Sequence, residues 1–161
     1  VFWYYENFGL SWDGITHGKV WQLLSYALLH GDWVHLVINL FILWFAGGRV
    51  LQMLGQRKSL EIITAGVLVG GLLDLLSGLL LVTGYRESYL VGISGACFAL
   101  LLAMATLSPH TRLRFIPVSG KNLGLGLVIG EALLWLMHPG LSLIQVGIWS
   151  LVLNTMGHWM V

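Results

Sequence analysis

Charged side chains are scarce in this sequence: Asp, Glu, Lys and Arg together make up 9% of its 161 residues. A soluble domain usually carries about 25% charged residues, because water must wet its whole surface. Hydrophobic residues account for 57% of the chain. The composition therefore argues against an ordinary soluble domain and indicates a protein whose natural solvent is the lipid bilayer.

Three further scarcities exclude other classes of protein. A single cysteine, Cys97, excludes an internal disulfide. A formal net charge of +1, with scattered basic residues, gives no case for a nucleic-acid partner. His30 and His35 would point about 140° apart on a helix, and no other metal-ligand cluster is found, so we expect no metal and no cofactor.

Five apolar stretches predict an all-α fold, a polytopic bundle of transmembrane helices. They cover approximately residues 33–54, 60–82, 94–107, 123–137 and 148–161. The second is long enough for a full span, which takes roughly 20 residues of helix. Residues 1–32 interleave aromatic residues with glycines and charges, which suits a loop in the headgroup region. We treat residues 1–161 as one membrane domain and expect the natural protein to extend beyond both ends.

Basic residues are concentrated in two of the predicted connections. Six of the eight Lys and Arg residues lie near the end of the first span or follow the first or the third span: Arg49, Arg57, Lys58, Arg112, Arg114 and Lys121. By the positive-inside rule these two connections are cytoplasmic. The first, third and fifth spans are therefore predicted to begin at the outer face.

This orientation brings four polar residues to a similar depth below the outer surface. His35 lies near the start of the first span with Asn39 one turn deeper, and Ser94 starts the third. His158 lies about ten residues, or about 15 Å, into the fifth span. The third span reaches only about 21 Å, less than a hydrocarbon core of about 30 Å, so a water-accessible cavity is predicted at its outer end.

Ser94 lies between two glycines in the sequence GISGA at residues 92–96. Flanking glycines allow a tight turn and leave room for a substrate carbonyl, and a backbone N–H at a helix start can donate to an oxyanion. Ser94 is therefore a candidate nucleophile, although serine is also favoured as an ordinary helix cap. Small residues recur every four positions at Gly95, Ala99 and Ala103, a spacing that lets neighbouring helices approach closely.

Two histidines and an asparagine are the remaining candidates. His158 can act as general base for Ser94, or it can pack between helices with a bond to a carbonyl. His35 and Asn39 share a helix face, where they can stabilise a developing negative charge or bond to another helix. A haem held by His35 and His158 is a further alternative.

Two carboxylates also lie within the predicted spans, at Asp74 and Glu131. A proton or ion pathway is one interpretation of such residues. We favour a hydrogen bond to a neighbouring helix for both, and assign neither to the candidate site.

Taken together, these residues resemble the rhomboid family of intramembrane serine proteases. The resemblance covers about residues 19–161 and rests on several short motifs in order: residues 21–30, His35 with Asn39, the glycines at 47–48 and 55, GISGA at 92–96, and Gly157-His158. These motifs are specific as a set, whereas singly none of them is. The resemblance implies a six-helix core whose first helix is missing from this chain.

Family membership would assign a role to each candidate residue. Ser94 and His158 correspond to a catalytic dyad with no acidic third member, and His35 and Asn39 to the oxyanion site with the Ser94 N–H. Positions with a supporting role are occupied by His30, Phe98, Gly92 and Gly95. The implied activity is that of a serine endopeptidase that cleaves transmembrane-helix substrates near the outer membrane face, with residues 123–146 as the expected lateral gate. The expected location is a bacterial cytoplasmic membrane.

Four positions depart from the family pattern. Arginine, glutamate, tyrosine and glycine are replaced by Gln22, Leu51, Phe98 and Val161, respectively. These departures motivate an alternative: a catalytically inactive rhomboid-like membrane subunit or chaperone that binds transmembrane segments without cutting them, within a larger membrane complex. Retention of both dyad residues argues for the enzyme, because non-proteolytic relatives typically lose one or both.

Overall fold

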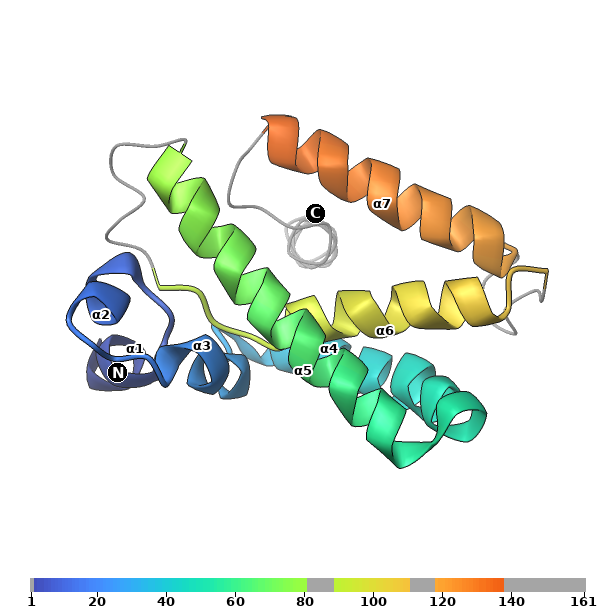
Figure 1. Cartoon of the computed structure of the whole chain (residues 1–161), viewed down its shortest axis with the longest axis horizontal. Coiled ribbons are helices and arrows are strands. Elements are labelled where there is room, and N and C mark those ends of the chain that lie inside the picture. The colour runs from blue at the N-terminus through green and yellow to red at the C-terminus, as the bar shows by residue number, and fades with distance from the viewer. Residues whose placement is uncertain (1, 81–88, 111–117, 138–161) are drawn as a thin grey trace, which may run out of the picture.

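A computed structural model describes residues 2–80, 89–110 and 118–137 of the chain (Figure 1). Regular secondary structure within these ranges is helical, and β-type pairing is limited to one isolated antiparallel bridge between Leu10 and Leu90. The all-α fold class is thus confirmed for this part of the molecule. The predicted fifth span, with His158 and Val161, lies outside the described residues.

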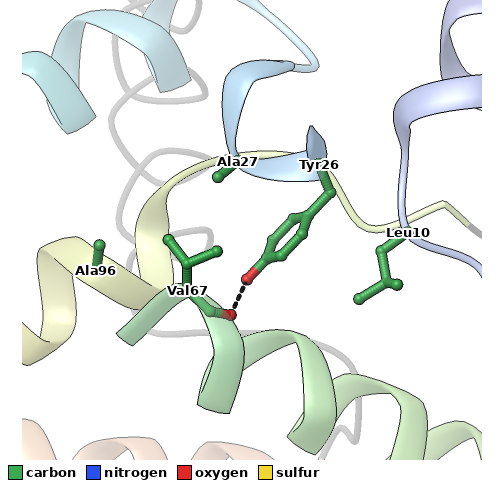
Figure 2. Close-up of a cluster of buried hydrophobic side chains, with 5 residues drawn as sticks. All are labelled: Leu10, Tyr26, Ala27, Val67 and Ala96. Atoms are coloured by element: carbon green, nitrogen blue, oxygen red, sulfur yellow. Dashed lines mark hydrogen bonds between the residues drawn. The ribbon is translucent and has the colours of Figure 1, made fainter. Parts of the chain in front are cut away.

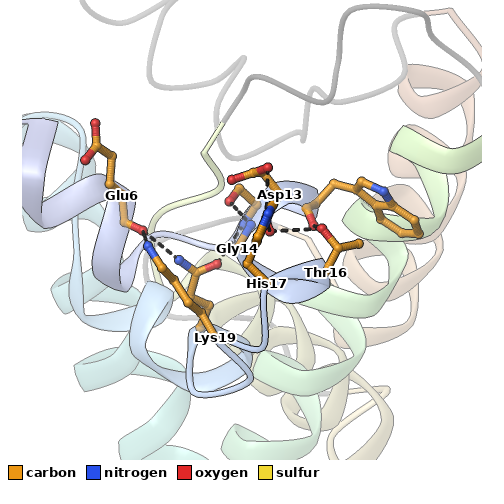
Figure 3. Close-up of polar contacts among 9 residues, drawn as sticks. Glu6, Asp13, Gly14, Thr16, His17 and Lys19 are labelled. Carbon is orange, nitrogen blue, oxygen red and sulfur yellow. Dashed lines mark hydrogen bonds and ion pairs between the residues drawn. The ribbon is translucent and has the colours of Figure 1, made fainter.

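Short helices fold the N-terminal segment before the first long helix begins. They are α1 (Phe2–Phe8), α2 (Trp12–Thr16), α3 (Gln22–Ser25) and the 3-10 turn η1 (Tyr26–Leu28). The last carbonyls of α1 have no N–H partner within the helix. They accept four side-chain hydrogen bonds of 2.8–3.0 Å: from Lys19 and Gln22 to Glu6, from Trp21 to Asn7 and from Ser25 to Phe8. Figure 3 shows Lys19 reaching the Glu6 carbonyl. These bonds tie α1 to the segment that carries α3.

A helical hairpin follows, made of α4 (Trp33–Ile42), the π-turn η2 (Leu43–Gly47) and α5 (Gly48–Leu80). Asp32 caps α4, because its carboxylate accepts a hydrogen bond of 2.8 Å from the His35 N–H. Within α5, Gly55 has φ 77° and ψ 172°, and the chain turns back there (Figure 1). Glycine adopts this conformation without the penalty that a β-carbon would bring.

Helix α6 (Ser94–Leu107) is surrounded by other elements, with α5 and α7 (Gly120–Met137) among its neighbours (Figure 1). Thr106 is the only exposed residue of α6. The other long helices expose large apolar side chains, for example Phe41, Trp44, Leu72, Leu73, Ile129 and Leu136. Apolar surface of this extent is typical of a membrane interface. By length and composition, Trp33–Ser77 is the one helical stretch of the described ranges that could cross a membrane, and α6 is a shorter apolar helix.

Two buried clusters hold α6 in place. The first joins the N-terminal segment to α5 and to the start of α6, through Leu10, Tyr26, Ala27, Val67 and Ala96 (Figure 2). The second lies further along α6 and joins it to the first arm of the hairpin, through Ala46, Val50, Leu100 and Met104. The start of α6 is therefore packed against two separate segments that precede it in the sequence, the N-terminal segment and α5.

Candidate active site

Ser94 is the first residue of α6, and its place is set by a close approach of two helix backbones. A β-carbon on Gly95 would lie 2.6 Å from the Gly66 carbonyl oxygen in α5. In the same way, a β-carbon on Gly66 would lie 2.8 Å from Ala96 Cα and from Ala99 Cβ. Contacts this short require glycine on both helices. The close packing predicted from the small residues of α6 is thus present, and its partner is α5.

The loop that leads to Ser94 is held by three backbone hydrogen bonds to the N-terminal segment. Leu10 and Leu90 exchange two of them, with N–O distances of 3.0 and 2.8 Å. In the third, the Gly92 N–H donates to the Tyr26 carbonyl at 2.9 Å. Residues 1–32 were predicted as an interfacial loop, and the described part of them also fixes the backbone next to Ser94.

Tyr26 is a supporting residue that motif reasoning did not single out. Its hydroxyl donates to the Val67 carbonyl at 2.6 Å (Figure 2). Gly71 leaves room for its ring. Burial, together with the nearby charge of Asp74, raises the pKa of Tyr26 to about 12. The phenol therefore stays protonated and keeps its donor role at any physiological pH. The signal for it lay within the motif at residues 21–30.

Gly92 brings the Ser94 loop into contact with α4. Its φ of 112° is one that other residues rarely adopt, and a β-carbon there would lie 2.6 Å from Cε1 and 2.8 Å from Nε2 of His35. The same β-carbon position is 3.7 Å from Asn39 Nδ2. The structure thus brings His35 and Asn39 beside the backbone two residues before Ser94.

His35 and Asn39 are buried polar residues with unused hydrogen-bonding capacity. His35 is 6% exposed and Asn39 is 0% exposed. Among the described residues, neither His35 Nε2 nor Asn39 Oδ1 has a hydrogen-bond partner. Most buried polar atoms in folded proteins are paired, because leaving one unpaired costs about 1–3 kcal/mol. The unpaired Nε2 of His35, beside Gly92, therefore indicates a site that binds a polar group.

His30 completes the cluster. Its Nε2 lies 3.1 Å from Asn39 Nδ2, and its ring meets the His35 ring edge to face with centroids 5.2 Å apart. The 140° separation considered for a helix does not apply, because residues 29–32 are not helical. Burial lowers the pKa of His30, against the opposing effects of the Leu28 carbonyl and the Asp32 carboxylate. His30 is therefore favoured as a neutral ring.

The other predicted residues fall into three groups. Phe98 is half-buried on α6, one turn after Ser94. Asp74 and Glu131 each take part in at least one interaction, so neither is an isolated carboxylate. His158 and the gate residues after position 137 lie outside the described ranges. Within those ranges, no group of three or more metal-ligating side chains comes together.

Two of the departures from the rhomboid pattern leave no unpaired charge. Gln22 is fully buried, and its amide donates to the Glu6 carbonyl at 3.0 Å and accepts from the Ser11 N–H at 3.3 Å. Gly14 makes room for this side chain, since a β-carbon there would overlap the Gln22 amide. Leu51 is 48% exposed. The neutral Gln22 amide thus holds the N-terminal segment through two hydrogen bonds. Leu51 is apolar and partly exposed, so its position leaves no buried charge without a partner.

Comparison with known proteins matches residues 17–160 to the family model described as the Rhomboid domain. The rhomboid protease GlpG of Pectobacterium atrosepticum is 34% identical over 83 residues, which cover 52% of this chain and 27% of that protein. Proteins of the same name from Salmonella choleraesuis and Salmonella newport are 27% identical over 130 residues, or 80% of this chain and 42% of theirs. The chain thus spans less than half the length of these relatives. No solved structure matches it.

Proposed function

Because the chain belongs to the rhomboid family, we propose that it is an intramembrane serine endopeptidase with Ser94 as nucleophile and His158 as general base. Rhomboid proteins are integral membrane proteins. The observation that carries the proposal is the buried, unpaired ring nitrogen Nε2 of His35 beside the backbone that leads to Ser94, together with the Asn39 amide nitrogen 3.7 Å from the β-carbon position of Gly92. A site for a developing negative charge has this composition.

The proposed reaction uses these residues in sequence. His158 takes the proton from Ser94 Oγ as the hydroxyl attacks the scissile carbonyl, and returns it to the leaving amine. The resulting oxyanion is stabilised by the Ser94 N–H, by Asn39 Nδ2 and by a ring N–H of His35. The Ser94 N–H suits this role, because the first N–H groups of a helix have no acceptor within it. Water then hydrolyses the acyl-enzyme ester by the same proton transfers.

The proposed substrates are single transmembrane helices, cleaved near the outer face of the membrane. This location follows from the charge pattern, because the connection with Arg57 and Lys58 and the connection with Arg112, Arg114 and Lys121 are predicted to be cytoplasmic. Ser94 and His35 would then lie toward the opposite face. The proposal includes a multi-pass topology in a bacterial cytoplasmic membrane and a six-helix core whose first helix is not in this chain.

The test is cleavage of a model transmembrane substrate by the full-length protein in liposomes. We expect Ser94→Ala to abolish cleavage at unchanged expression. Ser108→Ala is the matched control, because Ser108 follows the other end of α6 and its exposed hydroxyl lies 3.8 Å from Met53 Sδ. Equal cleavage by the wild type and by Ser94→Ala would remove the assignment.

The alternative is an inactive rhomboid-like subunit that binds transmembrane segments. It is motivated by the departures from the family pattern, of which Gln22 and Leu51 are accommodated without an unpaired charge. A fluorophosphonate probe separates the two functions, since it reacts only with an activated serine. Labelling of the wild type but not of Ser94→Ala favours the enzyme, and no labelling of a folded sample favours the subunit.

A further inference from the structure

We infer that His30 is a positioning residue, which holds the Asn39 amide so that one of its hydrogens points toward the oxyanion site. This inference rests on the proposed function, because it gives His30 a role in the reaction through Asn39. It differs from a purely structural role in one respect. A packing residue would affect stability alone, whereas a positioning residue affects the chemical step.

The contact between the two side chains fixes the chemistry that each must present. Asn39 Nδ2 lies 3.1 Å from His30 Nε2, within hydrogen-bond distance. An amide nitrogen only donates, so His30 Nε2 must accept. A neutral imidazole that accepts at Nε2 carries its proton on Nδ1. The geometry therefore calls for the neutral Nδ1–H form of His30, in agreement with the lowered pKa of its ring.

The second hydrogen of the Asn39 amide is the one available for substrate. Asn39 Nδ2 is 3.7 Å from the β-carbon position of Gly92, so the amide nitrogen faces the loop that leads to Ser94. Asn39 is fully buried, so the protein around it holds its side chain in place. If His30 were protonated on Nε2 instead, its hydrogen would face the Asn39 amide nitrogen. The amide would then have to rotate by about 180° so that its oxygen accepts that hydrogen.

His30 is itself held in place by contacts to α1 and to α4. Its backbone carbonyl accepts a hydrogen bond of 3.4 Å from the Tyr5 hydroxyl in α1, and its ring rests against His35. Residues 29–32 are not helical, so His30 can reach back to Asn39 across nine positions. The N-terminal segment thus sets the orientation of an oxyanion donor through one imidazole.

The first test is a double-mutant cycle on the full-length protein with a model transmembrane substrate. Loss of an oxyanion donor typically costs 10²–10³ in kcat, so we expect about a 100-fold loss for Asn39→Ala. We expect His30→Ala to lower kcat about tenfold with little change in KM. If His30 acts through Asn39, the double variant is no slower than Asn39→Ala. Multiplying losses would overturn the inference.

Two further variants distinguish loss of the hydrogen bond from misfolding as the cause of a lower kcat. His30→Gln keeps an acceptor oxygen for Asn39 Nδ2, and we expect it to recover most of the activity that His30→Ala loses. His17→Ala is the control histidine variant, because His17 is exposed at the end of α2 and pairs with Asp13. It should leave kcat unchanged. Equal losses in His30→Gln and His30→Ala would argue against a hydrogen-bonding role.

The second test does not depend on proteolysis. Nitrogen-15 NMR of the histidine rings in the full-length protein reports which nitrogen of His30 is protonated. We expect a protonated Nδ1 and an unprotonated Nε2, with a change in the Nε2 signal in Asn39→Ala. A proton on Nε2 would refute the inference whether or not the protein cleaves. If Ser94-dependent cleavage is absent, the proposed function fails, and with it the role of His30 in the reaction.

Discussion

Gly92 fits against His35 with no room for a side chain, since a β-carbon at position 92 would lie 2.6 Å from the ring carbon Cε1. The His35 ring on α4 and the loop before Ser94 are therefore in direct contact. This contact fixes the distance between α4 and the loop before Ser94 in the candidate site. A change at either residue should alter the other.

Gly92→Ala is predicted to destabilise the protein and to abolish Ser94 labelling. The positive φ alone costs about 1–3 kcal/mol for a residue with a β-carbon, and the contact with His35 adds to this. Gly31→Ala is the matched control, because no atom lies within 4 Å of a β-carbon there and its φ is ordinary. Thermal unfolding and fluorophosphonate labelling check both variants. Labelling of Gly92→Ala at the wild-type rate would contradict the contact.

Gly66→Ala is predicted to lower the melting temperature, because a β-carbon there would meet the backbone of α6 at 2.8 Å. Its control is Gly126→Ala on α7, where a β-carbon meets no atom within 4 Å. Replacing a helical glycine by alanine in open space stabilises a helix by up to about 1 kcal/mol. The two substitutions should therefore shift the melting temperature in opposite directions. A shift in the same direction for both would count against the close packing of α5 on α6.

Tyr26→Phe removes the hydrogen bond of 2.6 Å to the Val67 carbonyl and leaves the ring in place. Such a bond contributes about 0.5–1.5 kcal/mol, and we expect a loss of stability of that size. Tyr4→Phe is the control, because Tyr4 is 58% exposed. Denaturant unfolding in detergent measures both. Equal stabilities for the two variants would show that the Tyr26 hydroxyl contributes nothing.

The stability of the protein should fall as the pH drops below 6.5. The pKa of His30 is lowered from 6.5 in the folded state, so the unfolded chain binds the proton more readily. Between the two pKa values the unfolded state carries more protons, and the free energy of unfolding decreases with decreasing pH. It levels off once the folded state is protonated too. Melting temperatures across this range check the prediction.

His30→Gln is the control for that titration, because it removes the group and keeps its neighbours. Asp32 and His35, which lie beside His30, remain in this variant. Its melting temperature should depend less on pH than that of the wild type. A wild-type melting temperature that rises as the pH falls below 6.5 would contradict a lowered pKa for His30 in the folded state.

Local patterns in the sequence were enough to predict the helices around Ser94. The apolar stretch at residues 94–107 and α6 have the same bounds, since Ser94 begins the run and Ser108 with Pro109 ends it. The predicted stretch at residues 123–137 begins three residues late. Helix α7 starts at Gly120, where the Ser119 hydroxyl accepts from the Asn122 N–H. That cap is a sequence signal outside the apolar run.

The supporting contacts of the site could not be read from the sequence, because they join residues that are far apart in the chain. Glutamine is usually a surface residue, yet the Gln22 amide is buried and donates to a carbonyl 16 positions away. The contact between His30 and Asn39 depends on the non-helical path of residues 29–32. Local patterns do not encode such paths. The pairing of Ser94 with His158 stays a prediction.

The residues of α6 other than Thr106 are buried or only partly exposed, whereas α4, α5 and α7 expose several large apolar residues. We therefore expect acyl chains to contact α4, α5 and α7 more than the helix that begins with Ser94. A thicker bilayer or a different lipid mixture would act on this helix only through its protein neighbours. In the proposed enzyme, a turnover that responds to lipid type would then report on those outer helices, and the geometry around Ser94 would change little.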